Sequence, residues 1–208
     1  YTISEIRVTG DTVLPQEDVE RMVIQKEGHI FSRGLLEFSA DAITNSLSNI
    51  GYAFAKVNPI PTPNRAEQTV AVNMQVVPGP RVQVRRIEYK GNSRTSDEVL
   101  RREMRQFENS WYSQAAIDRS KIRLQRLGFF ESVEVETPAV PGSADQVDVV
   151  YTVKETTSGS FTFGLGYSQS YGMPTSIQLS QNNFLGGGNR VSVDASRSSY
   201  MQRYGFSY

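Results

Sequence analysis

The residue types that most often carry enzyme chemistry are scarce in this sequence. Its 208 residues contain no cysteine and one histidine, His29. A serine triad would have to be assembled around His29, and the sequence marks no partner for it, so we expect a surface histidine. Typical zinc and iron sites use several histidine or cysteine ligands. The sequence therefore predicts no enzyme, no metal site and no cofactor.

Glycines and carboxylates do not supply an alternative active site. Gly164-Leu165-Gly166 lacks the third glycine of a dinucleotide-binding loop and falls within a predicted strand, and Gly186-Gly187-Gly188 is better explained as a turn. The carboxylates are scattered over predicted strand faces and a loop, where solvation accounts for them. Examples are Glu134, Glu136, Asp145 and Asp148. Because the formal net charge is zero and the pI is ≈ 6.8, no nucleic-acid partner is expected.

What the chain does contain is one internal repeat. A strand-like segment ends at Gly10 in the first copy and at Gly91 in the second. The glycines that end a predicted helix, Gly51 and Gly128, recur at nearly the same offset (91 − 10 = 81 against 128 − 51 = 77). A period of this length indicates tandem modules rather than one mixed core.

Both copies have the order strand, helix, helix, strand, strand. In the first copy an apolar stripe at helical spacing precedes Gly51, the natural residue for a helix stop. The stripe consists of Leu36, Ala40, Ile43, Leu47 and Ile50. Such a copy predicts a three-stranded sheet covered on one face by two helices. Between the copies, the proline-rich segment from Val77 to Pro80 predicts a hinge with restricted swing.

The second copy adds two local signals. Thr95 to Glu98 has the pattern of a capping box, ahead of a stripe formed by Leu100, Met104 and Phe107. The last strand of this copy alternates, which predicts one buried face. The residues expected on that face are Val147, Val149, Tyr151 and Val153.

Small sheets of this kind have exposed edges. An edge offers unpaired N–H and C=O groups, to which an extended peptide can add as a further strand. The edge positions expected to bind substrate in this way are Lys56, Val57, Val133, Glu134 and Val135. The alternative is that the edges are protected surface, since Pro59, Pro61 and Pro63 follow the predicted middle strand of the first copy and would blunt its edge.

The last part of the chain has a different composition. From Ser158 to Tyr208 the charged side chains are limited to Arg190, Asp194, Arg197 and Arg203, and eight of the sixteen glycines lie there. From Ser160 to Ser168, odd positions are aromatic or apolar and even positions are small or polar, the pattern of a membrane-spanning β-strand. A soluble β-meander with one face on a core is the alternative.

Three further segments alternate in the same way. They cover residues 175–181, 190–196 and 202–208, and turn-like segments at 171–174, 182–189 and 198–200 separate them. The smallest single-chain barrels use eight strands, and an open edge is not tolerated in lipid. We therefore expect the start of a barrel whose other strands lie outside this sequence. Because Tyr1 falls at the first strand of a module, we also expect an excised fragment with its targeting signal upstream.

The predicted fold class is α+β. Two tandem β-α-α-β-β modules, residues 1–79 and 80–157, are followed by the first antiparallel strands of a transmembrane β-barrel, residues 158–208. In the second module Val99 to Gln106, Leu127 to Phe130 and Val140 to Tyr151 resemble the POTRA domains of the β-barrel assembly factors of the Gram-negative outer membrane. In that family the two modules would be the fourth and fifth of five.

The resemblance implies a non-enzymatic function. A protein of this family assembles β-barrel proteins and inserts them into the bacterial outer membrane, with its POTRA modules in the periplasm. Its partners would be unfolded outer-membrane proteins, accessory outer-membrane lipoproteins and the lipid bilayer. Two alternatives stay open: a POTRA-barrel transporter of the two-partner secretion type, and a membrane-anchored periplasmic binding scaffold.

The resemblance also implies two sites. The first barrel strand would be one side of a lateral seam at which substrates enter the membrane. Its residues are Ser160, Phe161, Thr162, Phe163, Gly164, Leu165, Gly166, Tyr167 and Ser168. The surface that meets a lipoprotein partner would contain Arg101, Arg102, Arg105 and Glu108. For these four residues the alternative is a solvated basic helix face.

Overall fold

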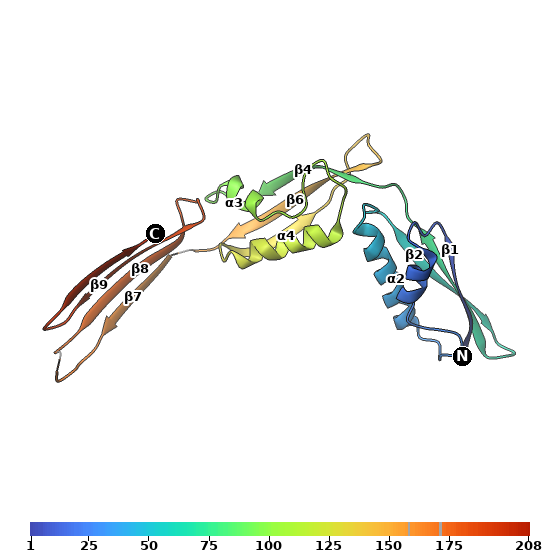
Figure 1. Ribbon diagram of the computed structural model, residues 1–208, viewed down its shortest axis with the longest axis horizontal. Coiled ribbons are helices and arrows are strands. Elements are labelled where there is room, and N and C mark those ends of the chain that lie inside the picture. The colour runs from blue at the N-terminus through green and yellow to red at the C-terminus, as the bar shows by residue number, and fades with distance from the viewer. Residues whose placement is uncertain (158, 171) are drawn as a thin grey trace. The chain divides into compact units, whose positions relative to one another are not determined.

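The computed structural model describes residues 1–157, 159–170 and 172–208 (Figure 1). Ser158, where the barrel part was expected to begin, and Tyr171, in an expected turn, lie outside the described residues. The chain forms two compact units. One contains Tyr1–Ile87, Gln106–Asp118 and Thr137–Val149, and the other contains Glu88–Arg105, Arg119–Glu136 and Val150–Tyr208.

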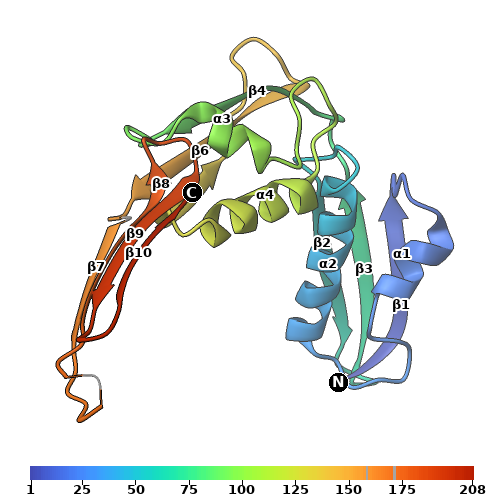
Figure 2. The ribbon, with the colours of Figure 1, turned by 60° about the vertical axis from the view of Figure 1, so that its left-hand side comes forward.

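The first module has the predicted order of elements. They are β1 (Thr2–Gly10), α1 (Gln16–Met22), α2 (Arg33–Ser48), β2 (Lys56–Asn64) and β3 (Thr69–Val77). The strand order is β1-β3-β2, in which β1 runs parallel to β3 and β2 runs antiparallel to it (Figure 2). β1 and β2 are therefore the edges of this sheet.

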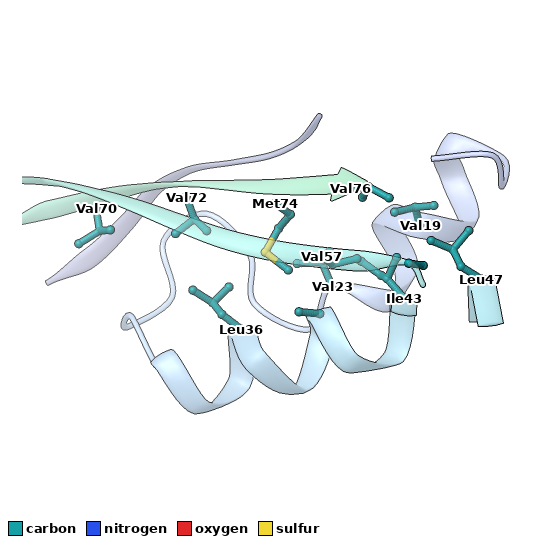
Figure 3. Packing of buried hydrophobic residues seen from close by; sticks show 12 residues of the cluster. Val19, Val23, Leu36, Ile43, Leu47, Val57, Val70, Val72, Met74 and Val76 are labelled. Carbon is teal, nitrogen blue, oxygen red and sulfur yellow. The ribbon is translucent and has the colours of Figure 1, made fainter. Parts of the chain in front are cut away.

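The core of this module lies between α2 and the sheet. Leu36 and Ile43 project from α2 toward Val72 and Met74 of β3, and all four side chains are buried (Figure 3). The predicted stripe is confirmed as far as Leu47. At Ile50 it is wrong, because α2 ends at Ser48 and this side chain is 36% exposed.

The second module consists of five elements in the same order. They are β4 (Gln83–Lys90), α3 (Asp97–Arg102), α4 (Gln114–Arg126), β5 (Phe130–Glu136) and β6 (Gln146–Glu155). The strand order β4-β6-β5 repeats that of the first module, with β5 antiparallel to β6. The predicted buried face of β6 is confirmed, since its four side chains are at most 3% exposed.

Two predictions for the first helix of this module are wrong. α3 ends at Arg102, so Met104 lies beyond the helix although it is buried, and Phe107 is 62% exposed. The capping box does not form, because the residue before the helix is Ser96 and no side chain caps it. The Thr95 hydroxyl instead accepts a hydrogen bond from Asn183 Nδ2 at 2.7 Å.

The last four strands form a separate antiparallel sheet. They are β7 (Gly159–Leu165), β8 (Thr175–Phe184), β9 (Asn189–Arg197) and β10 (Gln202–Ser207), in the order β10-β9-β8-β7. Among the described residues, no helix is long and apolar enough to cross a membrane.

Candidate functional site

The four-stranded sheet has one apolar face that is not covered by a core. Phe161, Leu179, Val193 and Phe206 are partners in register across the four strands and form one row. Their exposed fractions are 65%, 51%, 47% and 71%. A soluble meander would bury such a row, whereas a barrel wall presents it to lipid. The geometry thus favours a membrane-facing sheet.

The opposite face of the same sheet is polar and closely packed. The Ser160 and Ser180 hydroxyls are hydrogen-bonded to each other, as are those of Ser192 and Ser207. Gly205 lies opposite Asp194, and an added Cβ would lie 2.5 Å from Asp194 Oδ1, so a larger residue there would displace the Asp194 carboxylate. A lumen-facing surface of small and polar residues is typical of barrel interiors.

The predicted seam strand lies at an end of the sheet order, so β7 pairs with β8 alone among the described strands. Gly166 N–H donates to Pro174 O, so the backbone groups of Gly166 face β8. Because these directions alternate along a strand, the N–H and C=O groups of Phe161, Phe163 and Leu165 face the free edge. The predicted end of the strand is wrong, because β7 stops at Leu165. Gly166, Tyr167 and Ser168 follow it, and Ser168 pairs with Gly172 to close the hairpin.

The turn between β8 and β9 is a contact site that the sequence did not reveal. It lies against the segment that precedes α3: Ser96 N–H donates to Gly186 O at 3.1 Å, and Asn183 Nδ2 donates to Thr95 Oγ1. Arg102 Nη2 also donates to Gly187 O at 3.4 Å. The expected turn at 182–189 is wrong at its ends, because β8 continues to Phe184 and β9 begins at Asn189. We call residues 183–188, the end of β8 and the turn that follows it, the docked turn. The only sequence signal for it was the run of three glycines.

A carboxylate organises the segment that receives the docked turn. Glu155 at the end of β6 accepts hydrogen bonds from the N–H groups of Thr95 (2.8 Å) and Arg94 (3.1 Å) and from the Ser93 hydroxyl (3.1 Å). Partial burial works to raise the pKa of the Glu155 carboxyl, but these hydrogen bonds outweigh it, so the pKa lies below its ordinary value of 4.5.

This depressed pKa predicts an acid-sensitive segment. The ionised Glu155 stabilises the folded state fully above pH 4.5, and this contribution is lost as the pH falls through the lower pKa of the folded state. We expect the protection of the Thr95 amide, measured relative to its intrinsic exchange rate, to fall below that pH, and the Glu155→Ala variant to be poorly protected at every pH. Hydrogen exchange of the peptide covering residues 93–100 measures this. An unchanged pH profile in the variant would contradict the assignment.

The three arginines of the predicted lipoprotein surface have different neighbours. The Arg101 guanidinium lies 5.2 Å from the centre of the Tyr89 ring, and Arg102 contacts the docked turn. Arg105, which follows α3, donates from Nη1 to Met104 O. All three arginines are exposed, and Arg102 lies beside the docked turn. Glu108 belongs to the other compact unit, so its surroundings are described separately.

Glu108 lies at the edge of β4. Its Oε1 accepts the Ile87 N–H at 3.0 Å, and the next residues continue along the same edge: Val84 N–H donates to Ser110 O, and Asn109 N–H donates to Val84 O. Gln83 forms an antiparallel bridge with Trp111. Residues 108–112 therefore cover the outer edge of β4 from Val82 to Ile87.

Removal of this carboxylate tests its structural contribution. We expect Glu108→Ala to cost about 1–2 kcal/mol of stability at the β4 edge, because the Ile87 N–H loses its hydrogen bond in a partly buried position. Glu108→Gln keeps an acceptor oxygen and serves as the control. Amide exchange of Ile87 reports the difference, and equal exchange rates in the two variants would refute it.

The other predicted edge positions lie on strands that do end their sheets. Lys56 and Val57 are in β2, and Val133, Glu134 and Val135 are in β5. The expectation that the prolines follow the strand is wrong, because Pro59, Pro61 and Pro63 lie within β2 and pair with β3.

These prolines change what the β2 edge can offer. β2 stays paired with β3 at all three prolines, so the proline nitrogens face the free edge. The missing N–H groups therefore cost no hydrogen bond between β2 and β3. The N–H and C=O groups of Val57 face the same free edge. From Val57 to Pro63 this edge therefore presents carbonyl oxygens but, after the Val57 N–H, no further N–H donor. β5 contains no proline and can offer both kinds of group.

Comparison with known proteins identifies relatives of the whole chain. Residues 1–79 and 82–156 match the POTRA family, described as surface antigen variable number repeat. The outer membrane protein assembly factor BamA of Neisseria meningitidis is 32% identical over 195 residues, which cover 93% of this chain but 24%, about a quarter, of that relative. BamA from Haemophilus ducreyi lacking POTRA domains 1-3 superposes with a TM-score of 0.81 at 38% identity, covering 96% of this chain and 38% of the other. Haemophilus influenzae BamA POTRA3-5 superposes with a TM-score of 0.69 at 36% identity, covering 74% of this chain and 61% of the other.

Proposed function

Because the chain belongs to the POTRA family and matches outer-membrane assembly factors along nearly its whole length, we propose that it assembles β-barrel proteins and inserts them into the bacterial outer membrane. It is an outer-membrane protein with periplasmic POTRA modules, and its role is not enzymatic. The two modules would correspond to the fourth and fifth of the family, within 1–79 and 80–157.

The observation that carries this proposal is the edge of β7. It lies at one end of a sheet with an exposed apolar row, and the backbone groups of Phe161, Phe163 and Leu165 face outward from it. In lipid each N–H or C=O group without a hydrogen-bond partner costs several kcal/mol, about the free-energy cost of burying an amide that makes no hydrogen bond. An incoming strand of a substrate protein supplies those hydrogen bonds, so insertion at this edge is driven by pairing and needs no other energy source.

The periplasmic partners follow from the same proposal. Unfolded outer-membrane proteins would add as strands to the free edges of the modules, of which β5 with Val133, Glu134 and Val135 offers both donors and acceptors, and β2 offers the Val57 N–H beside Lys56. An accessory lipoprotein would meet Arg101, Arg102 and Arg105 and the neighbourhood of Glu108. Guanidinium groups pair well with carboxylates, so an acidic partner surface suits the three arginines.

A photo-crosslinking residue at Thr162 in the full-length parent tests the seam. Thr162 lies on the polar face of β7, so the substitution leaves the apolar row intact. Adducts with many different nascent barrel proteins are the expected result. A single secreted partner would instead indicate dedicated secretion, and adducts only with the chain's own last strand would indicate a closed anchor; either result would overturn the proposal.

A further inference from the structure

Two hollows adjoin where the docked turn meets the second module. One has a volume of ≈ 310 Å³ and lies between the docked turn and the segment that precedes α3, at Arg94 and Thr95. The other has a volume of ≈ 500 Å³ and lies over the apolar row of the sheet. We call them the junction pocket and the wall groove. Gln181 and Phe184 line both, and all the lining residues belong to one compact unit.

A bulge in β8 places Phe184 between the two spaces. Gln181 of β8 pairs with Val191. Three residues further along, Phe184 pairs with Asn189, which is only two residues from Val191, so β8 contains one extra residue. Strict alternation from Leu179 would place Phe184 on the polar face of the sheet. The extra residue reverses the alternation, and Phe184 instead lines the wall groove with Leu179 and Val191. The apolar face therefore extends as far as the junction pocket.

The length of β8 places this bulge at a membrane boundary. The strand has ten residues, Thr175–Phe184, and about nine to eleven tilted residues cross a bilayer core. Because the docked turn contacts a periplasmic module, Phe184 lies at the periplasmic end, a level at which aromatic side chains are typical. Leu185, next to it, is 86% exposed and has φ +53°, which is rare for leucine. The turn thus keeps an apolar side chain uncovered at this level.

Among the described residues, two polar side chains at this level have no partner in the protein. The Arg94 guanidinium lines the junction pocket and makes no hydrogen bond or ion pair, since the nearby Glu155 carboxylate accepts from backbone N–H groups and from Ser93. Gln181 lies two residues after Leu179 and so projects from the apolar face, and no described residue hydrogen-bonds its amide. An unpaired amide beside hydrocarbon is costly. The arrangement therefore suits a ligand that has polar groups above an acyl chain.

We propose that the junction pocket and the wall groove together bind one glycerophospholipid of the periplasmic leaflet. The Arg94 guanidinium would bind its phosphate, because the two groups can pair through two parallel hydrogen bonds. The Gln181 amide would donate to a glycerol ester, and one acyl chain would lie on Phe184 and Leu179 in the wall groove. The site goes beyond the proposed function, since it requires a membrane-facing sheet and not the insertion of a substrate.

The wall groove favours a lipid over a soluble phosphate compound. Its apolar lining would stay exposed to water beside a soluble anion, whereas an acyl chain covers it. The lining includes Phe161, Leu179, Phe184, Val191 and Val193. Arg94 belongs to the second module and Gln181 to β8, so a lipid held by both would bridge the module and the barrel wall.

Native mass spectrometry of the full-length protein in detergent, titrated with phosphatidylethanolamine, tests the site. We expect Arg94→Gln to weaken binding of the tightest lipid about ten- to a hundredfold, the effect of losing a hydrogen bond between charged groups. Arg190→Gln is the matched control, because Arg190 lies at the same end of the sheet but, one residue before Val191, on its polar face. Equal weakening in the two variants, or none in Arg94→Gln, would overturn the inference.

Two further probes separate the phosphate from the acyl chains. Dioleoylglycerol has the chains but no phosphate, so it should bind the unmodified protein more weakly than phosphatidylethanolamine does, and should bind Arg94→Gln with the same affinity as the unmodified protein. Equal binding of both lipids to the unmodified protein would show that no headgroup is recognised. Inorganic phosphate should not displace the lipid, and displacement would indicate an anion site that needs no lipid; either result would contradict the proposal.

A photoreactive lipid locates the bound chain. Phosphatidylethanolamine with a diazirine near the glycerol end of one acyl chain, in nanodiscs, should label Phe184 and Leu185 more than Ile177, which lies farther along the same apolar face. Arg94→Gln should remove this preference while Ile177 is still labelled. A preference that persists in the variant would reflect depth in the bilayer alone, and a defined site would then be refuted.

Discussion

Gly186→Ala should release the docked turn from the segment that precedes α3. Gly186 has φ +75°, and a Cβ at this position would lie 1.9 Å from Arg94 O, a backbone atom that cannot move aside without disturbing the hydrogen bonds to Glu155. The strained φ costs about 1 kcal/mol, and loss of the Ser96 and Asn183 hydrogen bonds costs about 1 kcal/mol each. The docked state would be disfavoured by about 3 kcal/mol, roughly a hundredfold.

The Ser96 amide reports this release. It donates to Gly186 O, so its exchange with solvent should accelerate by about two orders of magnitude in the variant. Gly187→Ala is a matched control in the same turn. A Cβ there would meet Phe184 O at 3.6 Å, an ordinary contact, and Gly187 does not have a positive φ. If the two variants exchange equally, the turn is not held by this contact.

Gly91→Ala should strongly destabilise the second module. Gly91 follows β4 with φ +88°, and a Cβ would lie 2.0 Å from Val153 O of β6. Gly10 has the same relation to Val76 O in the first module, at 2.2 Å with φ +91°. Left-handed strain and displacement of a paired strand together should cost about 3 kcal/mol.

The control for this change is Gly128→Ala. Gly128 has φ +75°, but nothing lies within 4 Å of the added Cβ, so only the conformational cost of about 1 kcal/mol applies. Amide exchange of the β6 residues in the full-length protein, compared between the two variants, gives the difference in local stability. A Gly91→Ala protein as stable as Gly128→Ala would show that the strand end moves aside freely.

Regular local patterns predicted most of the fold. The stripe from Leu36 to Leu47 marks α2 because period and burial agree, and the alternation from Val147 to Val153 marks the buried face of β6. The repeat predicted the modules and the change in composition predicted a separate sheet. Each of these signals depends on residues close together in the chain or on a comparison of like segments.

What sequence reasoning missed depends on distant partners. The hydroxyl of Thr95 was expected to cap α3, but it accepts a hydrogen bond from Asn183, far along the chain in the docked turn. The contact of Glu108 with the Ile87 N–H depends on how the chain returns to the β4 edge, and no local pattern specifies that return.

The parallel pairing of β1 with β3 also sets the order in which a module can fold during export. Thr2 pairs with Thr69, so β1 has no strand partner until the chain has emerged at least as far as Thr69. Closing so long a loop costs entropy before any contact offsets it. β2 and β3 are adjacent and can pair first. A chain that is exported amino terminus first therefore carries β1 without its β3 partner until the module is complete.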